Sequence, residues 1–338
     1  MNAIRVIKPG ILTTVQDLGR KGYQQYGMSV AGAMDSFALQ AANLMVGNPR
    51  EEAGLEITFP GFEAEFLCDC VIAVTGGDLG AKINERYIPR WKSIYVYKGS
   101  RIIFGKLGEG CRAYLAIAGG IEVPVIMGSK STYLRGKIGG YKGRKLAADD
   151  ILQIGKLNKA QMQMVGKRLP IVDIPKYKQP CKVRVVLGPQ QDAFTKKSIQ
   201  TFLTQPYKVG QESDRMGYRL EGPKLEHIEK ADIISDGIPL GAVQVPGHGT
   251  PIIMLADRQT TGGYTKIATV VSVDISKLAQ LRPGDEIRFE QVDVEEAHKL
   301  LKKQEDILNR LQNTTTIPKI RSYTIIVNGK SYDVSVEE

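Results

Sequence analysis

Runs of alternating apolar and polar residues, separated by glycines, prolines and polar turns, dominate this chain. Such alternation has the period of a β-strand, whose successive side chains point to opposite faces. We predict strands at residues 63–75, 94–104, 111–118, 183–188, 251–256 and 268–275. Many short strands between turn residues favour a mainly β fold built of barrels or sandwiches.

Helical spacing of apolar residues is found in fewer places. It is clearest from Ser36 to Val46, where Asp35 is placed to cap the helix and Gly47 to end it. Residues 193–203 form a second candidate helix, and residues 294–311 have the pattern of a charged amphipathic helix. A β majority with a few helices predicts a β-rich α+β class.

The C-terminal end has a pattern of its own. After the polar residues 313–316, residues 323–336 alternate like two strands on either side of Asn328-Gly329. An Asn-Gly pair supplies the positive φ angles of a tight hairpin turn. Because an isolated hairpin is marginally stable in water, we expect this one to dock on another element or to stay mobile.

Similar stretches recur in the two halves of the chain. Arg5-Val6-Ile7 resembles Arg184-Val185-Val186, and Gln16-Asp17 resembles Gln191-Asp192. The spacing between partners is not constant, so either the halves are related with insertions or the similarity arose by chance. Residues 155–180 contain three prolines and no strong strand pattern, as expected of a connection.

The length of 338 residues allows two domains, each with its own core. We expect an N-terminal half over residues 1–175, a C-terminal half over residues 176–292, and a helix with a hairpin over residues 293–338. No apolar run approaches the roughly 20 residues of a membrane span, and the N-terminus lacks the apolar core of a signal peptide. We therefore predict a cytoplasmic protein that does not contact a membrane.

Charge and cysteine content narrow the classes of partner. The net charge is +10, but the basic residues are dispersed and no nucleic-acid module accompanies them, so we predict no nucleic-acid partner. Small anions, an acidic partner or plain solvation account for the charge. The four cysteines form no C-x-x-C pair and only three histidines are present, so we predict reduced thiols and no metal site.

The densest polar cluster lies at residues 257–266, directly after the apolar run 251–256. It contains a carboxylate, two cations, an amide and four hydroxyl side chains around a glycine pair. Binding residues commonly lie where a buried strand opens into such a loop, and these groups suit an anionic or amide-bearing ligand. The alternative is a polar turn whose side chains satisfy only local backbone groups.

Three further stretches carry candidate chemistry. Gln16, Asp17 and Arg20 repeat the amide, carboxylate and cation of the first cluster near the N-terminus. Arg215 is a candidate anion clamp, with a structural ion pair among Asp214, Arg215 and Arg219 as the equal alternative. The cations and glycines of residues 130–144 are compatible with phosphate but lack P-loop spacing. The isolated carboxylates of Glu56 and Asp78 are interpreted as structural.

Several of these motifs resemble one known family. They are residues 13–20, 31–35, 41–48, 73–78, 188–190, 213–217 and 256–264. The chain resembles the family of allophanate hydrolase subunit 2, also called the biotin-dependent carboxyltransferase or KipA family, from about residue 3 to about residue 290. The resemblance implies two linked cyclophilin-like β-barrel domains and a KipI-like B subunit as partner.

The same resemblance implies the leading function. It is that of the C subunit of an ATP-dependent 5-oxoprolinase, which opens 5-oxoproline to glutamate with the B subunit and a further A subunit. One alternative is a KipA-type regulator that binds and antagonises a KipI-like inhibitor of a histidine kinase. The other is a carboxyltransferase served by a separate biotin carrier. We expect ATP with magnesium in the complex, and no biotin on this chain, because residues 323–336 look like the start of a biotin carrier domain without its Met-Lys site.

Under the leading hypothesis we assign roles from chemistry. Arg258 and Lys266 are the cations for charge that develops during the reaction, and Asp257 is an orienting group or proton acceptor. The residues expected to bind and orient the substrate are Gln259, Thr260 and Thr261 from the same segment, Arg215, and, from the other half, Gln16, Asp17 and Arg20.

Overall fold

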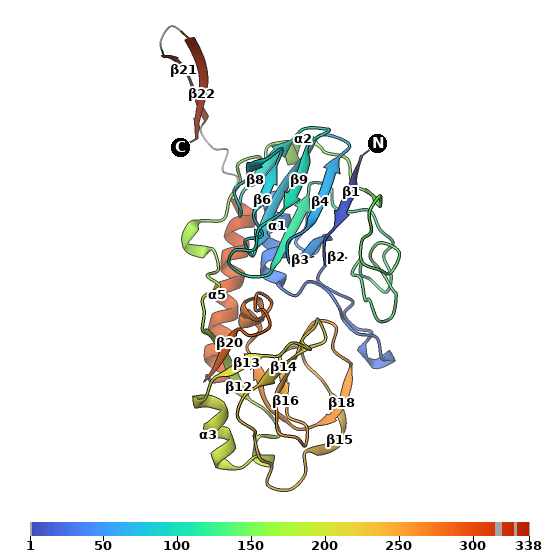
Figure 1. Cartoon of the computed structure of the whole chain (residues 1–338), viewed down its shortest axis with the longest axis vertical. Coiled ribbons are helices and arrows are strands. Elements are labelled where there is room, and N and C mark those ends of the chain that lie inside the picture. The colour runs from blue at the N-terminus through green and yellow to red at the C-terminus, as the bar shows by residue number, and fades with distance from the viewer. Residues whose placement is uncertain (1, 315–319, 328–329, 338) are drawn as a thin grey trace.

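The molecule has two β-rich lobes with a long helix alongside both (Figure 1). The computed structural model describes residues 2–314, 320–327 and 330–337. Strands form most of its regular structure, so the predicted mainly β class is confirmed. Within the described part of the chain, no helix is both long and apolar enough to cross a membrane.

The N-terminal lobe is a pair of packed sheets. Its strands are β1 (Ala3–Pro9), β2 (Leu12–Gln16), β3 (Gly54–Thr58), β4 (Phe62–Phe66), β5 (Cys70–Gly76), β6 (Ala81–Ile83), β7 (Arg86–Tyr87), β8 (Ser93–Val96), β9 (Arg101–Phe104), β10 (Arg112–Ile117) and β11 (Ile151–Gln153). One sheet has the order β11-β1-β4-β9-β6-β7 and the other the order β2-β3-β10-β5-β8. Apolar side chains of both sheets, such as Ile4, Phe62, Leu55 and Ile72, form the core between them.

Helix α1 (Ser36–Met45) covers the outer face of the five-stranded sheet. Along β10, Ala113 and Leu115 pack into the core between the sheets, whereas Tyr114 and Ala116 pack with α1. Successive side chains of a strand alternate between faces, so covering both faces buries the whole strand. The predicted helix and its cap are confirmed, since Ala38 N donates to the Asp35 carboxylate at 3.0 Å.

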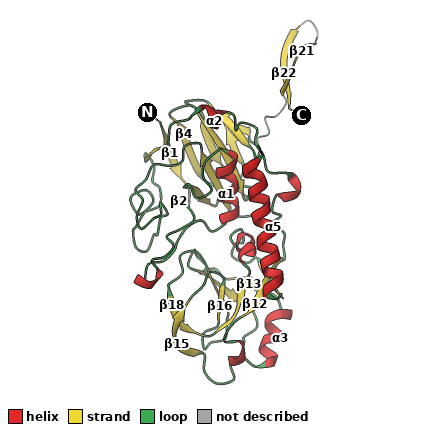
Figure 2. Cartoon of the chain, turned by 180° about the vertical axis from the view of Figure 1, so that it is seen from behind, coloured by secondary structure: helices red, strands yellow, loops and turns green. Residues whose placement is uncertain are grey.

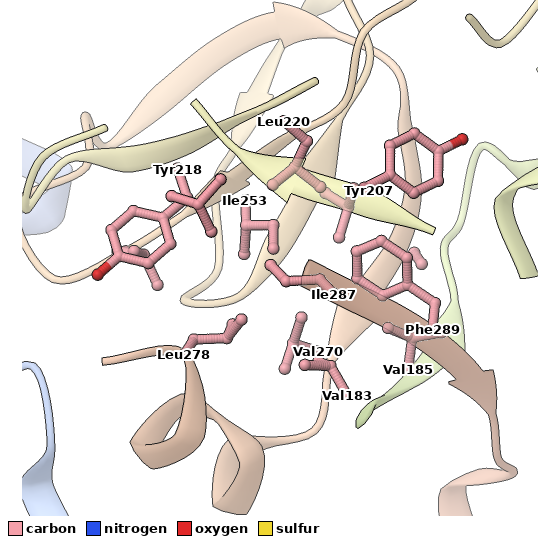
Figure 3. Close-up of a cluster of buried hydrophobic side chains, with 14 of the residues drawn as sticks. Val183, Val185, Tyr207, Tyr218, Leu220, Ile253, Val270, Leu278, Ile287 and Phe289 are labelled. Carbon is pink, nitrogen blue, oxygen red and sulfur yellow. The ribbon is translucent and has the colours of Figure 1, made fainter. Parts of the chain in front are cut away.

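The C-terminal lobe is a closed barrel. Its strands are β12 (Cys181–Leu187), β13 (Tyr207–Val209), β14 (Gly217–Glu221), β16 (Ala242–Gln244), β17 (Ile252–Met254), β19 (Lys266–Val270) and β20 (Glu286–Gln291). They close in the order β12-β19-β16-β17-β14-β13-β20, and the parallel pair β12 and β20 completes the ring. Figure 3 shows the interior, where Val183, Ile253, Ile287 and Phe289 point toward one another.

Smaller elements surround this barrel. They are η3 (Gln191–Ala193), α3 (Lys196–Thr204), the ribbon of β15 (Asp232–Gly237) with β18 (Thr261–Tyr264), η4 (Ser272–Asp274) and α4 (Ile275–Leu278). Helix α3 packs on the barrel through Phe202, which stacks on Phe289 with ring centroids 4.2 Å apart. It begins later than the predicted residue 193, because Thr195 caps it by accepting from Ser198 N.

Helix α5 (Val294–Asn313) runs from the barrel back to the N-terminal lobe (Figures 1 and 2). Its buried residues Leu308 and Leu311 pack in the cluster of α1, and Arg50 pairs with Glu305 at 2.9 Å. The connection between the lobes, with α2 (Lys159–Met162) and η2 (Ile171–Asp173), runs beside it. Helix α5 therefore connects the barrel to the N-terminal lobe and packs against that lobe.

Three predicted strands differ from the observed ones. The run 63–75 divides into β4 and β5, and the run 94–104 into β8 and β9, because polar turns interrupt each alternation. In these turns Lys98 N donates to the Asp69 carboxylate at 2.8 Å, and Gly99 adopts a positive φ of 82°. The run 268–275 ends as a strand at Val270, and η4 begins at Ser272.

The C-terminal hairpin consists of β21 (Ile320–Val327) and β22 (Lys330–Glu337), which pair with each other in antiparallel register. Its predicted turn residues, Asn328 and Gly329, lie outside the described residues. In both whole-chain views the two strands lie away from the lobes (Figures 1 and 2).

Candidate active site between the lobes

A groove of 560 Å³ lies between η1 (Gln24–Tyr26) of the N-terminal lobe and two segments of the C-terminal lobe. Its lining residues are Gln24, Gln25, Gly237, Ile238, Pro239, Leu240, Arg258, Thr260 and Thr261. The lining therefore contains two amides, one guanidinium and two hydroxyls next to a short apolar segment. A small polar ligand that needs both hydrogen bonds and charge neutralisation matches this composition.

Arg258 is the cation of this groove. Its Nε donates to the Ile238 carbonyl at 2.8 Å and its Nη1 to the Leu255 carbonyl at 3.2 Å. Among residues 2–314, no carboxylate lies within ion-pairing distance of it. Burial lowers its pKa to about 10, so it remains protonated at neutral pH. A largely buried cation without a counter-charge favours binding of an anion or a developing negative charge.

Of the other residues in this segment, Thr260 and Thr261 line the groove and Gln259 does not. The ammonium of Lys266 lies 2.9 Å from the Asp236 carboxylate, and Lys266 is almost fully buried while the Asp236 side chain is 57% exposed. The hydrogen bond from Lys266 holds the pKa of Asp236 below its usual value. The structure thus brings Lys266 together with an acid that the sequence analysis did not propose.

Asp257 is held by Arg215. The guanidinium donates from Nε and Nη2 to the two carboxylate oxygens at 3.0 and 2.9 Å. Both side chains are buried, so the pair is shielded from solvent. Arg215 does not pair with Asp214, whose carboxylate instead accepts from Met216 N at 2.7 Å within the turn. Both carboxylate oxygens of Asp257 are therefore engaged by Arg215.

The same guanidinium reaches across to the N-terminal lobe. Its Nη1 donates to Glu56, and its Nη2 also donates to the Gly32 carbonyl at 2.6 Å. Glu56 in turn accepts from the Tyr114 hydroxyl at 2.7 Å. Burial opposes the charge of Arg215, but Asp257 and Glu56 outweigh it and raise its pKa. Glu56, Arg215 and Asp257, called the seam network below, join the lobes through buried charges.

Gln16, Asp17 and Arg20 organise a loop of their own lobe. Asp17 accepts from the Ser129 hydroxyl at 2.7 Å and from Lys130 N at 2.6 Å. Gln16 Nε2 donates to the Thr132 carbonyl at 3.1 Å, and Arg20 Nε donates to the Ile126 carbonyl at 3.3 Å. None of these three residues lines the groove.

Arg20 nevertheless lies near the seam between the lobes. Its burial lowers its pKa, while Asp17 and, from the other lobe, Asp257 act in the opposite direction. Arg20 Nη1 and Gln16 Oε1 are buried without a hydrogen-bond partner among the described residues. Such atoms are costly to leave unsatisfied, so burying these two atoms opposes the stability of this loop.

The glycine-rich stretch 130–144 is partly neutralised by local acids. Lys130 pairs with Glu52 at 2.6 Å, and Arg144 pairs with Asp150 at 2.7 Å. These two cations therefore support the loop. Within the described residues, no group of three or more His, Cys, Asp or Glu is arranged to hold a metal ion.

Sequence reasoning missed Gln24, Gln25 and Asp236 at this site, as well as the role of Glu56. Gln24 and Gln25 carry no motif, and only the fold brings them to the groove. Glu56 and Arg215 are 159 residues apart in the chain. The one usable signal was Arg215 itself, because a guanidinium often forms paired hydrogen bonds with a carboxylate.

The fold and this site define a two-lobed β protein with a polar groove at the seam between its lobes. Residues 26–291 match the carboxyltransferase domain, subdomain A and B, and the chain belongs to this family. The chain is 38% identical over 308 residues to the C subunit of 5-oxoprolinase from Escherichia coli, covering 91% of this chain and 97% of that protein.

Two further relatives extend the comparison. The chain is 36% identical to the C subunit of 5-oxoprolinase from Haemophilus influenzae, covering 88% of this chain and 94% of that protein. The crystal structure of Kluyveromyces lactis urea amidolyase superposes with a TM-score of 0.87 at 33% identity. That match covers 93% of this chain but only 20% of the amidolyase, which is a much longer protein.

Proposed function

We propose that this chain is the C subunit of an ATP-dependent 5-oxoprolinase, which opens 5-oxoproline to glutamate with a KipI-like B subunit and an A subunit. Relatives that are named as the C subunit of 5-oxoprolinase and align over nearly their whole length support this proposal. The observation that carries it is the groove between the lobes, where Arg258 has no carboxylate partner among residues 2–314 and lines the same wall space as Thr260 and Thr261.

The chemistry of the substrate matches these groups. In 5-oxoproline the ring amide is a poor electrophile, because the nitrogen lone pair is delocalised into the carbonyl. Hydrolysis adds water to the carbonyl carbon and breaks the ring C–N bond, and the nitrogen leaves as an amine after it takes up a proton. Negative charge develops on the carbonyl oxygen, and a preorganised cation stabilises it. In this proposal Arg258 supplies that charge, or neutralises the substrate carboxylate, while Thr260 and Thr261 orient the ring.

The groove geometry gives the neighbouring residues different roles. Both oxygens of Asp257 are engaged by Arg215, so we assign Asp257 as a positioning residue for the adjacent Arg258. Lys266 is paired with the exposed Asp236 and lies outside the groove lining, so it stabilises the ribbon next to the site. ATP and magnesium belong to the proposed complex, and we assign neither to a residue of this groove.

One alternative has an observation in its favour. The family is that of a carboxyltransferase domain, and the urea amidolyase fold superposes over nearly the whole chain. A carboxyltransferase reaction also develops negative charge on an amide or urea oxygen, which the same guanidinium would stabilise. In that case a separate biotin carrier delivers the carboxylate to this groove.

The test is a reconstituted complex of this chain with the B and A subunits, assayed for glutamate formed from 5-oxoproline and ATP. We expect Arg258→Ala to lower turnover by about 10²–10³, the loss typical of one electrostatic group in the transition state. Arg219→Ala is the matched control, because Arg219 is an exposed arginine of the same lobe. Circular dichroism and co-elution of the subunits check folding and assembly.

Each outcome points to one interpretation. Near-normal turnover of Arg258→Ala would remove this groove from the active site. Separate elution of the subunits at micromolar concentration would count against the complex. If the complex forms no glutamate but accepts labelled carboxylate from a carboxybiotinyl carrier, the carboxyltransferase alternative replaces the leading proposal.

A further inference from the structure

A second cavity, of 440 Å³, lies where the connection between the lobes enters the barrel. Three parts of the chain line it: the turn at Glu109 and Gly110, residues 176–182, and several residues between 277 and 285. It shares no lining residue with the groove at Arg258. We call it the connection pocket. Its volume is typical of sites for small organic ligands.

The walls of the connection pocket carry an excess of positive charge. The cations are Lys176, Lys178, Lys182, Lys277 and Arg282, and the carboxylates are Glu109 and Asp285. Both carboxylates are already engaged. Glu109 accepts from Tyr177 N at 2.7 Å, and Asp285 accepts from Arg282 N at 2.8 Å and lies 3.7 Å from Arg282 Nε.

The lysines of the connection are the unneutralised charges of this pocket. Lys277 pairs with Asp274 at 2.9 Å. For Lys176, Lys178 and Lys182, no ion pair with a carboxylate is present within 4.0 Å among residues 2–314. Lysine ammonium groups bind phosphate as mobile point charges, and several of them around one cavity favour a ligand with more than one negative charge.

The floor of the connection pocket is preformed and partly apolar. Cys181 and Leu281 are buried there beside Gln280, which is only 2% exposed. The Gln280 amide is fixed to the N-terminal lobe: its Oε1 accepts from Cys111 N at 3.1 Å and its Nε2 donates to Asp35 at 3.1 Å. A cavity of this size exceeds a bare inorganic anion, so the apolar floor leaves room for an organic group.

We propose that the connection pocket binds a small organic molecule bearing a diphosphate or longer phosphate chain. The phosphates contact the lysines of residues 176–182, and the organic group packs against Leu281 and Pro180. Such a ligand bridges the connection and both lobes, so its binding stabilises the seam between them. The inference concerns binding by this chain alone and holds whichever reaction the groove at Arg258 serves.

The test is isothermal titration calorimetry of the full chain with ADP and, separately, with inorganic pyrophosphate. We expect saturable binding of ADP that weakens as salt rises, because the contacts are charged and partly exposed. The double variant Lys178→Ala/Lys182→Ala should weaken this binding about tenfold or more, since two unpaired cations are removed. The matched control is Lys196→Ala/Lys197→Ala, which removes two exposed lysines of α3 with the same change in net charge.

The outcomes separate the possible ligands. Equal affinity for pyrophosphate and ADP supports the site and assigns recognition to the phosphate chain, whereas tighter binding of ADP assigns part of it to the apolar floor. The proposal is overturned if no heat of binding is detected at millimolar ADP or pyrophosphate. It is also overturned if both double variants bind equally, or if 5-oxoproline displaces the ligand. Circular dichroism and thermal melting of each variant check that it is folded.

Discussion

Arg215 and Arg258 are buried to almost the same extent in the C-terminal lobe, with 5% and 7% of each residue exposed. Arg215 meets the carboxylates of Asp257 and Glu56, whereas Arg258 meets only backbone carbonyls. The pKa of Arg215 is raised and that of Arg258 is lowered to about 10. The two arginines are therefore equally buried but differ in their charged surroundings. The charge of Arg215 is neutralised by carboxylates and joins the lobes, whereas the charge of Arg258 remains available to bind an anion.

The largest expected effect on stability is at Arg215. Arg215→Met leaves Asp257 and Glu56 buried without their cation, which should lower the free energy of unfolding by about 3–5 kcal/mol. Arg258→Met removes a cation whose hydrogen bonds go only to two backbone carbonyls, so we expect the free energy of unfolding to fall by a smaller amount, about 1–3 kcal/mol. Urea denaturation of both variants and the wild type measures the difference. Equal losses would contradict the contrast between the two arginines.

An intermediate case is the Arg184–Asp274 pair of the barrel, where Arg184 is partly exposed and Asp274 is buried. Burial alone would raise the pKa of Asp274, but hydrogen bonds from Arg184 and the nearby Lys277 outweigh it and hold the pKa below 3.8. Asp274→Asn should lower the free energy of unfolding at neutral pH by about 1–3 kcal/mol.

The sign of the pH dependence follows from the depressed pKa. The contribution of Asp274 is complete above its ordinary value of 3.8 and is lost as the pH falls toward its folded pKa. The gap between wild type and Asp274→Asn should therefore be constant near neutral pH and narrow below about pH 4. Asp306→Asn, at an exposed site of α5, is the matched control. A gap that widens as the pH falls would show that the pair does not act through the ionised carboxylate.

The smallest expected effect is at the C-terminus. Ending the chain after Thr314 removes β21 and β22 but keeps Leu308 and Leu311, which pack in the α1 cluster. We expect a change of no more than about 0.5 kcal/mol in the free energy of unfolding, as for changes outside any core. Ending the chain after Asp306 removes both leucines and should cost several times more. Thermal melting of the two truncated chains measures this difference. A large drop in melting temperature for the chain that ends after Thr314 would show that the hairpin is part of a core.

Part of the candidate site followed from residue types and spacing. Arg258, Thr260 and Thr261 were proposed from their density after an apolar run, and they line one groove. Lys266 belonged to the same run of residues but begins β19 of the barrel, where its ammonium pairs with Asp236 of the neighbouring ribbon strand β15. A strand alternates its side chains between faces, so neighbours in sequence separate in space.

The sequence by itself determined the local elements: the strand and helix patterns, the Asp35 cap of α1 and the amphipathic face of α5. These depend on contacts within a few residues, where periodicity and capping chemistry act directly. Only the tertiary structure decided that Arg215 meets Glu56, that Gln24 joins Arg258, and that the lysines of the connection surround a pocket. The physical reason is that partners far apart in the chain meet only when the two lobes pack, and packing also determines which buried charges are compensated and which remain available to a ligand.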